Sequence, residues 1–321
     1  MYSRSQLPQR IDRQYQVDLP HQTPHADEGH TVPTSIGACP TDRRQPRPRM
    51  PIVPVEDPAD PRLADYRDVP DPVLLRERGL FVAESRLVVQ ALLAHTRMQT
   101  RSLFVTEAAL ASLEGLLSGR QDDLPVYLGA HQLLRQVVGF KVHRGCLALG
   151  ERSAPVTDGE VSALATARLV VVLEHVANPD NVGSIFRNAT AFGAECVLLS
   201  PHCCDPLYRK AIRTSLGATL RIPYGEVVDW PEGLHRLREQ GYTTVALTPE
   251  PDALSLSAFA AAAPARIALL LGTEGAGLSD HAAASVDRRV RIPMAPDVDS
   301  LNVATAAGIA LYEFSQGHGR N

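Results

Sequence analysis

The sequence has no long apolar run. No stretch approaches the roughly 18 consecutive apolar residues of a membrane-spanning helix, and the polar N-terminus lacks the apolar core of a secretion signal. Cysteine is scarce, with five residues and no C-x-x-C pair. This pattern is typical of a reducing compartment and gives no basis for a structural metal site. We therefore expect a cytoplasmic protein without a metal and without a membrane anchor.

An excess of positive charge is also missing. The chain has 32 Lys and Arg residues against 36 Asp and Glu, a formal net charge of -4. This balance excludes a globally basic nucleic-acid-binding protein, although it allows a local basic face. The length of 321 residues and the 44% hydrophobic content indicate about two ordinary globular domains.

Proline is concentrated near the N-terminus. Eleven of the 25 prolines lie in residues 1–62, among Gln, His and Arg clusters without apolar periodicity. Such a composition buries too little apolar surface to offset chain entropy, so we expect residues 1–55 to form a disordered leader. We also expect translation to begin near Met50, which mass spectrometry of the native N-terminus can test. The alternative interpretation is a basic RNA-binding arm.

Strand and helix patterns alternate through the rest of the chain. They predict a small α/β domain over residues 56–150, a linker over 151–166 and a second α/β domain over 167–321. Continuous apolar runs at 169–173 and 267–271 are typical of parallel strands covered by helices on both faces. Further strands of the second domain are expected at 196–199, 220–223, 244–247 and 289–292.

One candidate functional loop, residues 174–188, follows the first strand of the second domain. Ligands bind at the carboxyl ends of parallel strands, which makes such loops the place to search. The Asn-Pro-Asp-Asn segment is strong turn chemistry, and Asn181 is placed to cap a helix that carries Arg187 about two turns later. A capped helix with a surface arginine is an equally good interpretation of this loop alone.

Two further loops follow later strands. Residues 272–279 contain three glycines, which allow a ligand close to the backbone, but neither the G-x-G-x-x-G nor the Walker spacing. The charge of Glu274 would repel a phosphate, so a neutral or cationic ligand fits better. Residues 292–303 lead into an alanine-rich helix that Ser300 is placed to cap. A simple glycine turn and ordinary core packing are the alternatives for these two loops.

Taken together, the elements N-P-x-N-x-G-x-x-x-R, G-x-E-G-x-G-L and I-P-M…S-L-N-V resemble the three motifs of the SpoU (TrmH-like) RNA ribose 2′-O-methyltransferases of the SPOUT superfamily. The resemblance covers about 60–318. It implies a C-terminal knotted (trefoil) parallel-sheet methyltransferase domain after a smaller ribosomal-protein-like substrate-binding domain. It also implies S-adenosylmethionine as cofactor, RNA and not DNA as substrate (rRNA or tRNA, with the two-domain layout favouring rRNA) and a homodimer formed through the catalytic domain.

The resemblance also assigns residues to roles. Arg187 would either activate the ribose hydroxyl or grip the adjacent phosphate. The full catalytic set is Arg187, Asn181, Glu274, Ser300 and Asn302, and the cofactor-binding set is Gly272, Thr273, Ile292, Met294 and Leu301, with Thr248 as a weaker candidate. The candidate RNA-binding residues are Arg209, Lys210 and Arg213, spaced for one side of a helix, with Arg135, Lys141 and Arg144 in the first domain. A solvated helix face is the other interpretation of the first three.

This chain departs from the family pattern after I-P-M, where Pro296 and Asp297 stand in place of glycine. The loop is therefore stiffer and more negative, which puts its cofactor contacts in question. Two other functions remain open. A non-catalytic RNA-binding or ribosome-assembly protein of the same fold is disfavoured by the complete catalytic set, and a nucleotide-dependent oxidoreductase is disfavoured by the absence of an early G-x-G-x-x-G.

Overall fold

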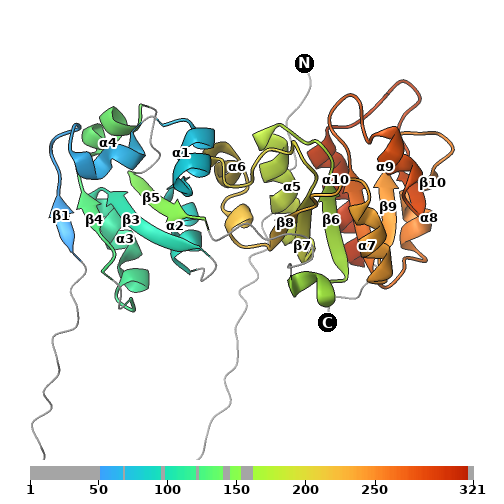
Figure 1. Cartoon of the computed structure of the whole chain (residues 1–321), viewed down its shortest axis with the longest axis horizontal. Coiled ribbons are helices and arrows are strands. Elements are labelled where there is room, and N and C mark those ends of the chain that lie inside the picture. Colours follow the sequence, from blue (N-terminus) through green and yellow to red (C-terminus); the bar gives the residue numbers. More distant parts are fainter. Residues whose placement is uncertain are drawn as a thin grey trace, which may run out of the picture. The chain divides into compact units, whose positions relative to one another are not determined.

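The computed structural model describes residues 51–67, 69–94, 98–120, 123–139, 145–152 and 162–316. The first region, residues 51–152, contains a five-stranded mixed sheet in the order β1-β4-β3-β5-β2 (Figure 1). β1 and β3 run parallel to β4, whereas β5 runs antiparallel to β2 and β3. The strands are β1 (Ile52–Pro54), β2 (Leu80–Glu84), β3 (Gln99–Val105), β4 (Val126–Leu128) and β5 (Cys146–Glu151).

Helices cover both faces of this first sheet. Side chains of a strand alternate between faces, so Leu103 and Phe104 of β3 enter two different apolar clusters. Leu92 and Leu113 belong to one cluster and Leu134 to the other. The helices are η1 (Pro61–Tyr66), α1 (Asp71–Arg78), α2 (Arg86–Ala94), α3 (Glu107–Leu117) and α4 (His131–Val138).

The first strand lies inside the segment that we predicted as leader. Ile52 pairs with Val126 in the register of β1 and β4, and the Val55 N–H donates to the Leu128 carbonyl at 2.9 Å. Val55 is also buried. The predicted boundary at residue 55 is therefore wrong, because residues 51–55 belong to the first sheet. The rest of the predicted leader lies outside the described residues.

The second region, residues 162–316, contains a seven-stranded parallel sheet in the order β10-β12-β9-β11-β6-β7-β8. Each pairing between neighbouring strands is parallel, which confirms the predicted parallel sheet. The strands are β6 (Leu169–Leu173), β7 (Cys196–Leu199), β8 (Tyr224–Glu226), β9 (Thr243–Leu247), β10 (Leu254–Ser255), β11 (Ile267–Leu271) and β12 (Arg288–Arg291).

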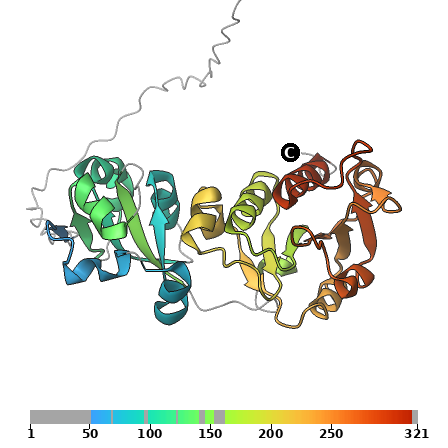
Figure 2. The same ribbon diagram turned by 90° about the horizontal axis from the view of Figure 1, so that it is seen from above.

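Two apolar layers enclose the second sheet. Val171 of β6 packs with the helices α5, α8 and α10, whereas its neighbour Val170 packs with η3 and α7. α5 and α10 lie side by side on one face (Figures 1 and 2). The helices are η3 (Ser162–Ala165), α5 (Pro179–Ala191), α6 (Arg209–Thr214), η4 (Ala218–Leu220), α7 (Gly233–Glu239), α8 (Leu256–Ala260), α9 (Asp280–Ala284) and α10 (Val303–Gln316). None of the helices described here is long and apolar enough to cross a membrane.

The strand predicted at 220–223 is wrong. η4 ends at Leu220, and β8 begins only at Tyr224. Gly217 before η4 has a left-handed backbone with φ of +77°, and Pro223 has no N–H to give to a sheet. The apolar residues of this segment therefore pack around a turn, and the strand starts after the proline.

Candidate active site

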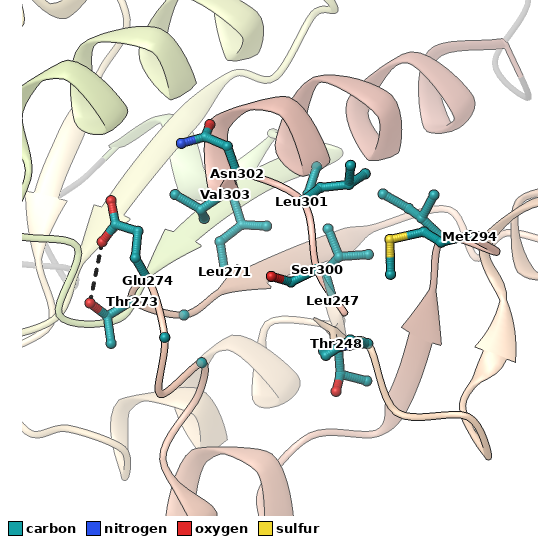
Figure 3. Close-up of a pocket in the computed structure, with 16 residues that line it drawn as sticks. Leu247, Thr248, Leu271, Thr273, Glu274, Met294, Ser300, Leu301, Asn302 and Val303 are labelled. Atoms are coloured by element: carbon teal, nitrogen blue, oxygen red, sulfur yellow. Dashed lines mark hydrogen bonds between the residues drawn. The ribbon is translucent and has the colours of Figure 1, made fainter. Parts of the chain in front are cut away.

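A cavity of 320 Å³ opens at the carboxyl ends of β9, β11 and β12. Its size lies at the lower end of the range for small-molecule sites, about 300–1,000 Å³. Figure 3 shows the Glu274, Ser300 and Asn302 side chains around the same space. The lining residues are Leu247, Thr248, Pro249, Leu271, Gly272, Thr273, Glu274, Gly275, Gly277, Ile292, Met294, Ser300, Leu301, Asn302, Val303 and Ala306.

The cavity brings together all six residues that we predicted to contact the cofactor. These are Thr248, Gly272, Thr273, Ile292, Met294 and Leu301, which come from three separate strand ends. Leu247 and Leu271 also line it and were missed, although both end the strands that we predicted. Pro296 and Asp297 are exposed and do not line the cavity. The departure from the family pattern therefore lies outside the cavity wall.

The glycines of the loop after β11 are required by its shape. Thr273 and Gly277 exchange backbone hydrogen bonds of 3.1 and 3.0 Å, so the loop doubles back on itself. A Cβ atom on Gly272 would lie 2.2 Å from the backbone carbon of Gly277. Gly275 and Gly277 have φ angles of +85° and +72°, a conformation that favours glycine. The loop therefore presents backbone groups directly to the cavity.

The cap of α5 differs from the prediction. The Asn178 side chain accepts a hydrogen bond from the Asp180 N–H at 2.9 Å, so Asn178 caps the helix in place of Asn181. Pro179 takes the first helical position, where its missing N–H costs nothing. Asn181 lies in the first turn and is buried, and its Oδ1 accepts from the Asn302 Nδ2 at 3.0 Å.

The cap of α10 is also displaced from the predicted Ser300. Asn302 Oδ1 accepts from the N–H groups of Ala304 and Thr305 at 3.0 and 3.2 Å. Because its amide nitrogen donates to Asn181, the same side chain joins the first turn of α5 to the start of α10. Ser300 lines the cavity, and its hydroxyl makes no hydrogen bond to another described residue.

Arg187 lies on α5 and is exposed. It does not line the cavity, and among the described residues no ion pair or hydrogen bond engages its guanidinium. Glu274, Ser300 and Asn302 therefore line one cavity, and a hydrogen bond from Asn302 connects Asn181 to this group. The guanidinium donors of Arg187 are open to a ligand.

The cations of α6 face carboxylates. Lys210 Nζ lies 2.7 Å from Asp180, and the hydrogen bond that it donates lowers the pKa of the Asp180 carboxyl. Arg213 lies 3.9 Å from the buried Glu84. The backbone N–H of Arg209 donates to Asp71 at 2.9 Å. A phosphate at this helix would have to compete with these carboxylates.

The predicted RNA-binding residues of the first region are only partly described. Arg135 is exposed in the last turn of α4. Lys141 and Arg144 lie outside the described residues.

No group of three or more His, Cys, Asp or Glu side chains within the described ranges could hold a metal ion.

A parallel α/β sheet with this site defines a class of protein that binds a small organic ligand at its strand ends. The cavity wall is largely apolar, with backbone groups and the Glu274 carboxylate, which suits a neutral or cationic ligand better than a phosphate.

Comparison with known proteins gives the family. The sequence profile of the SpoU rRNA Methylase family matches residues 168–312. A Mycobacterium bovis protein named as an uncharacterized tRNA/rRNA methyltransferase is 44% identical over 262 residues, which cover 80% of this chain and 89% of that protein. The 23S rRNA (guanosine-2′-O-)-methyltransferase RlmB of Xanthomonas campestris is 33% identical and covers 57% of this chain and 74% of the relative. An AdoMet-bound rRNA methyltransferase structure from Sinorhizobium meliloti has a TM-score of 0.69 at 23% identity, covering 84% of this chain and 99% of that one. The chain belongs to the SpoU methylase family, which confirms the resemblance of its three loops, and it is a methyltransferase.

Proposed function

We propose that this protein transfers a methyl group from S-adenosylmethionine to a ribose 2′-hydroxyl of RNA. The observation that carries the proposal is the cavity, in which three separate loops place all six predicted cofactor residues beside Glu274, Ser300 and Asn302. The names of relatives that act on rRNA support RNA as the substrate. We propose rRNA in preference to tRNA on the same basis.

The residues of the cavity fit S-adenosylmethionine. Gly272, Gly275 and Gly277 line the cavity without side chains, so a ligand can approach the backbone of their loop. Leu247, Leu271 and Val303 supply apolar surface. Glu274 is exposed at the same site and complements the positive charge of a sulfonium. When bound, the cofactor supplies an activated methyl group.

The protein must orient the ribose and manage its proton, because a neutral hydroxyl is a poor nucleophile. Ser300 offers a hydroxyl that no other described residue engages. Asn302 is already committed to Asn181 and to the start of α10, so it acts by fixing the position of the Ser300 segment. Holding the hydroxyl in line with the methyl group then supplies much of the acceleration.

Arg187 is the residue that we propose to grip the RNA next to the reacting ribose. Arginine side chains keep their proton in proteins and bind phosphate through two parallel hydrogen bonds. Its exposure on α5 suits this role, and its positive charge would stabilise negative charge that develops on the 2′-oxygen.

The test compares Arg187→Ala with the wild-type protein and with Arg288→Ala. Arg288 is an exposed arginine at the first residue of β12, the amino end of a strand whose carboxyl end borders the cavity, and it does not line the cavity. We expect Arg187→Ala to lose methyl transfer to RNA while calorimetry shows unchanged cofactor affinity, and Arg288→Ala to retain both. Full transfer by Arg187→Ala would reject this role.

A non-catalytic RNA-binding or ribosome-assembly protein is the alternative function. It predicts RNA binding without cofactor binding, so a calorimetric titration with S-adenosylmethionine separates the two. Heat of binding in the wild-type protein that is reduced by a substitution at Gly272 would favour the enzyme.

Two further properties complete the proposal. We infer that the C-terminal chain forms the trefoil knot of the family and that the first region binds the RNA substrate.

We also infer a homodimer through α5 and α10, because a groove between them includes Phe192, Gly308 and Tyr312, of which Tyr312 is 48% exposed. Light scattering of the wild-type protein and of Tyr312→Asp tests the dimer.

A further inference from the structure

Glu174 is a buried carboxylate that the proposed reaction does not use. It directly follows β6, its side chain is 1% exposed, and it does not line the cavity. Its Oε2 accepts from the Ser279 N–H at 2.9 Å. Its Oε1 accepts from the Ser279 hydroxyl at 2.6 Å and from the Trp230 Nε1–H at 2.6 Å. Three donors therefore converge on one carboxylate.

Ser279 is the far end of the loop that borders the cavity. This loop, residues 272–279 (called the glycine loop below), leaves β11 at Gly272 and enters α9 after Ser279. The Ser279 hydroxyl also accepts from the Ala282 N–H at 3.2 Å and so caps α9. At the near end, the Glu174 N–H donates to the Leu271 carbonyl at 2.8 Å. Glu174 thus contacts both ends of the glycine loop, the far end through its carboxylate and the near end through its backbone N–H.

We propose that Glu174 is a positioning residue that holds the glycine loop in its ligand-binding shape and couples that loop to Trp230. The proposal rests on the proposed function, because it takes the cavity as the S-adenosylmethionine site. Gly272, Thr273, Glu274, Gly275 and Gly277 line this cavity, so the glycine loop makes up much of its wall. A loop that is free to move would have to be ordered again each time a ligand binds, which weakens affinity.

The carboxylate is required because it only accepts hydrogen bonds. A glutamine at position 174 has nearly the same shape, but its amide NH2 would face a donor from Ser279 or Trp230 and leave it without an acceptor. Hydrogen bonds to a charged group, and buried donors left without a partner, carry the larger energies among hydrogen bonds. The Gln variant therefore tests the contact and leaves the volume unchanged.

The experiment measures the Kd for S-adenosylmethionine by calorimetry and kcat with RNA. For Glu174→Gln we expect affinity to fall about tenfold or more, with kcat at saturating cofactor close to wild type, because the groups at the cavity are unchanged. Ser279→Ala should weaken binding in the same direction. Ser279→Thr should restore it, since Thr keeps the hydroxyl and the exposed Ser279 leaves room for a methyl group.

Asp287 supplies a matched control. Its carboxylate accepts from both the N–H and the hydroxyl of Thr244 at 2.8 and 2.7 Å, the same pair of contacts that Glu174 makes to Ser279. Asp287 and Thr244 do not line the cavity. We expect Asp287→Asn to lower the Tm and leave the Kd unchanged. A general loss of stability would affect both variants alike.

Trp230 provides a signal that does not depend on turnover. It is the only tryptophan of the chain, so the fluorescence of the protein reports on this contact. We expect S-adenosylmethionine to change the Trp230 emission at the same concentrations as calorimetry, and Ser279→Ala to abolish the change.

Four results decide the proposal. Weaker binding in Glu174→Gln and Ser279→Ala, recovery in Ser279→Thr and an unaffected Asp287→Asn would support it. Wild-type affinity in Glu174→Gln would overturn it and leave the proposed function standing. Equal losses of affinity in Glu174→Gln and Asp287→Asn would also overturn it. A wild-type protein that does not bind S-adenosylmethionine would overturn both this inference and the proposed function.

Discussion

The replacement Gly272→Ala tests whether the glycine loop shapes the ligand site. A Cβ atom at this position would lie 2.2, 2.3 and 2.4 Å from Gly277 C, Leu278 N and Gly277 O. All three are backbone atoms, so no side-chain rotation can relieve the contacts, and the loop must move. Overpacking of this kind costs about 1–3 kcal/mol. Since about 1.4 kcal/mol corresponds to a factor of ten, a site that must restore the original loop would bind its ligand about 5- to 150-fold more weakly.

Calorimetric titration with S-adenosylmethionine measures this change, and thermal unfolding shows whether the variant is folded. Gly115→Ala is the matched control. Gly115 lies within α3 with no atom within 4 Å of its added Cβ, so alanine there should stabilise the protein by about 0.5–1 kcal/mol and leave cofactor binding unchanged. A folded Gly272→Ala protein with wild-type affinity would refute the assignment of this loop to the ligand site.

Three further predictions concern other contacts. Asn302→Ala removes the cap of α10, so we expect stability to fall by about 1 kcal/mol and kcat to fall as well. An unchanged kcat would show that the cap does not contribute to the reaction. Because Lys210 lowers the pKa of the Asp180 carboxyl, their pairing stabilises the fold above the ordinary aspartate range and is lost as pH falls through the lowered pKa. Urea unfolding of Asp180→Asn should therefore show a weaker loss of stability in acid than the wild-type protein, and identical curves would contradict this. Burial raises the pKa of Cys146 and Cys204 to about 12, so both thiols should resist iodoacetamide at pH 8 until the protein unfolds. Mass spectrometry measures the labelling, and alkylation of either thiol in the native protein would contradict the prediction.

The sequence predicted the parallel sheet well because it follows from strong local signals, whereas the residues that line the cavity were assigned by the resemblance of three loops to a known family. Apolar runs such as Leu169–Leu173 are typical of strands buried on both faces, and they are β6 and β11 in the structure. The carboxyl ends of parallel strands lie on one side of the sheet, so loops that follow these strands were the place to search, and those after β11 and β12 line the cavity together with the end of β9. Prediction was weaker where one residue decides between similar structures. Asn178 and Asn181 are both good caps, and Pro179 settles the choice by fixing the first helical position.

Side-chain contacts between distant segments could not be predicted from the sequence. Asn302 pairs with Asn181 across 121 residues, and Glu174 meets Ser279 across 105. No local pattern in the sequence predicts that these side chains meet. The edge strand β1 was missed for a similar reason, since Ile52–Pro54 is short and proline-rich and becomes a strand only by pairing with β4.

The most direct test of the account is transfer of a labelled methyl group from S-adenosylmethionine to fractionated cellular RNA. Alkali cleaves RNA through the free 2′-hydroxyl, so a 2′-O-methyl group protects the neighbouring phosphodiester bond. We predict that the wild-type protein places the label in alkali-resistant dinucleotides of rRNA and that Arg187→Ala does not. Label recovered in single nucleotides, which would indicate a methylated base, or no transfer to any RNA fraction would contradict the proposed function.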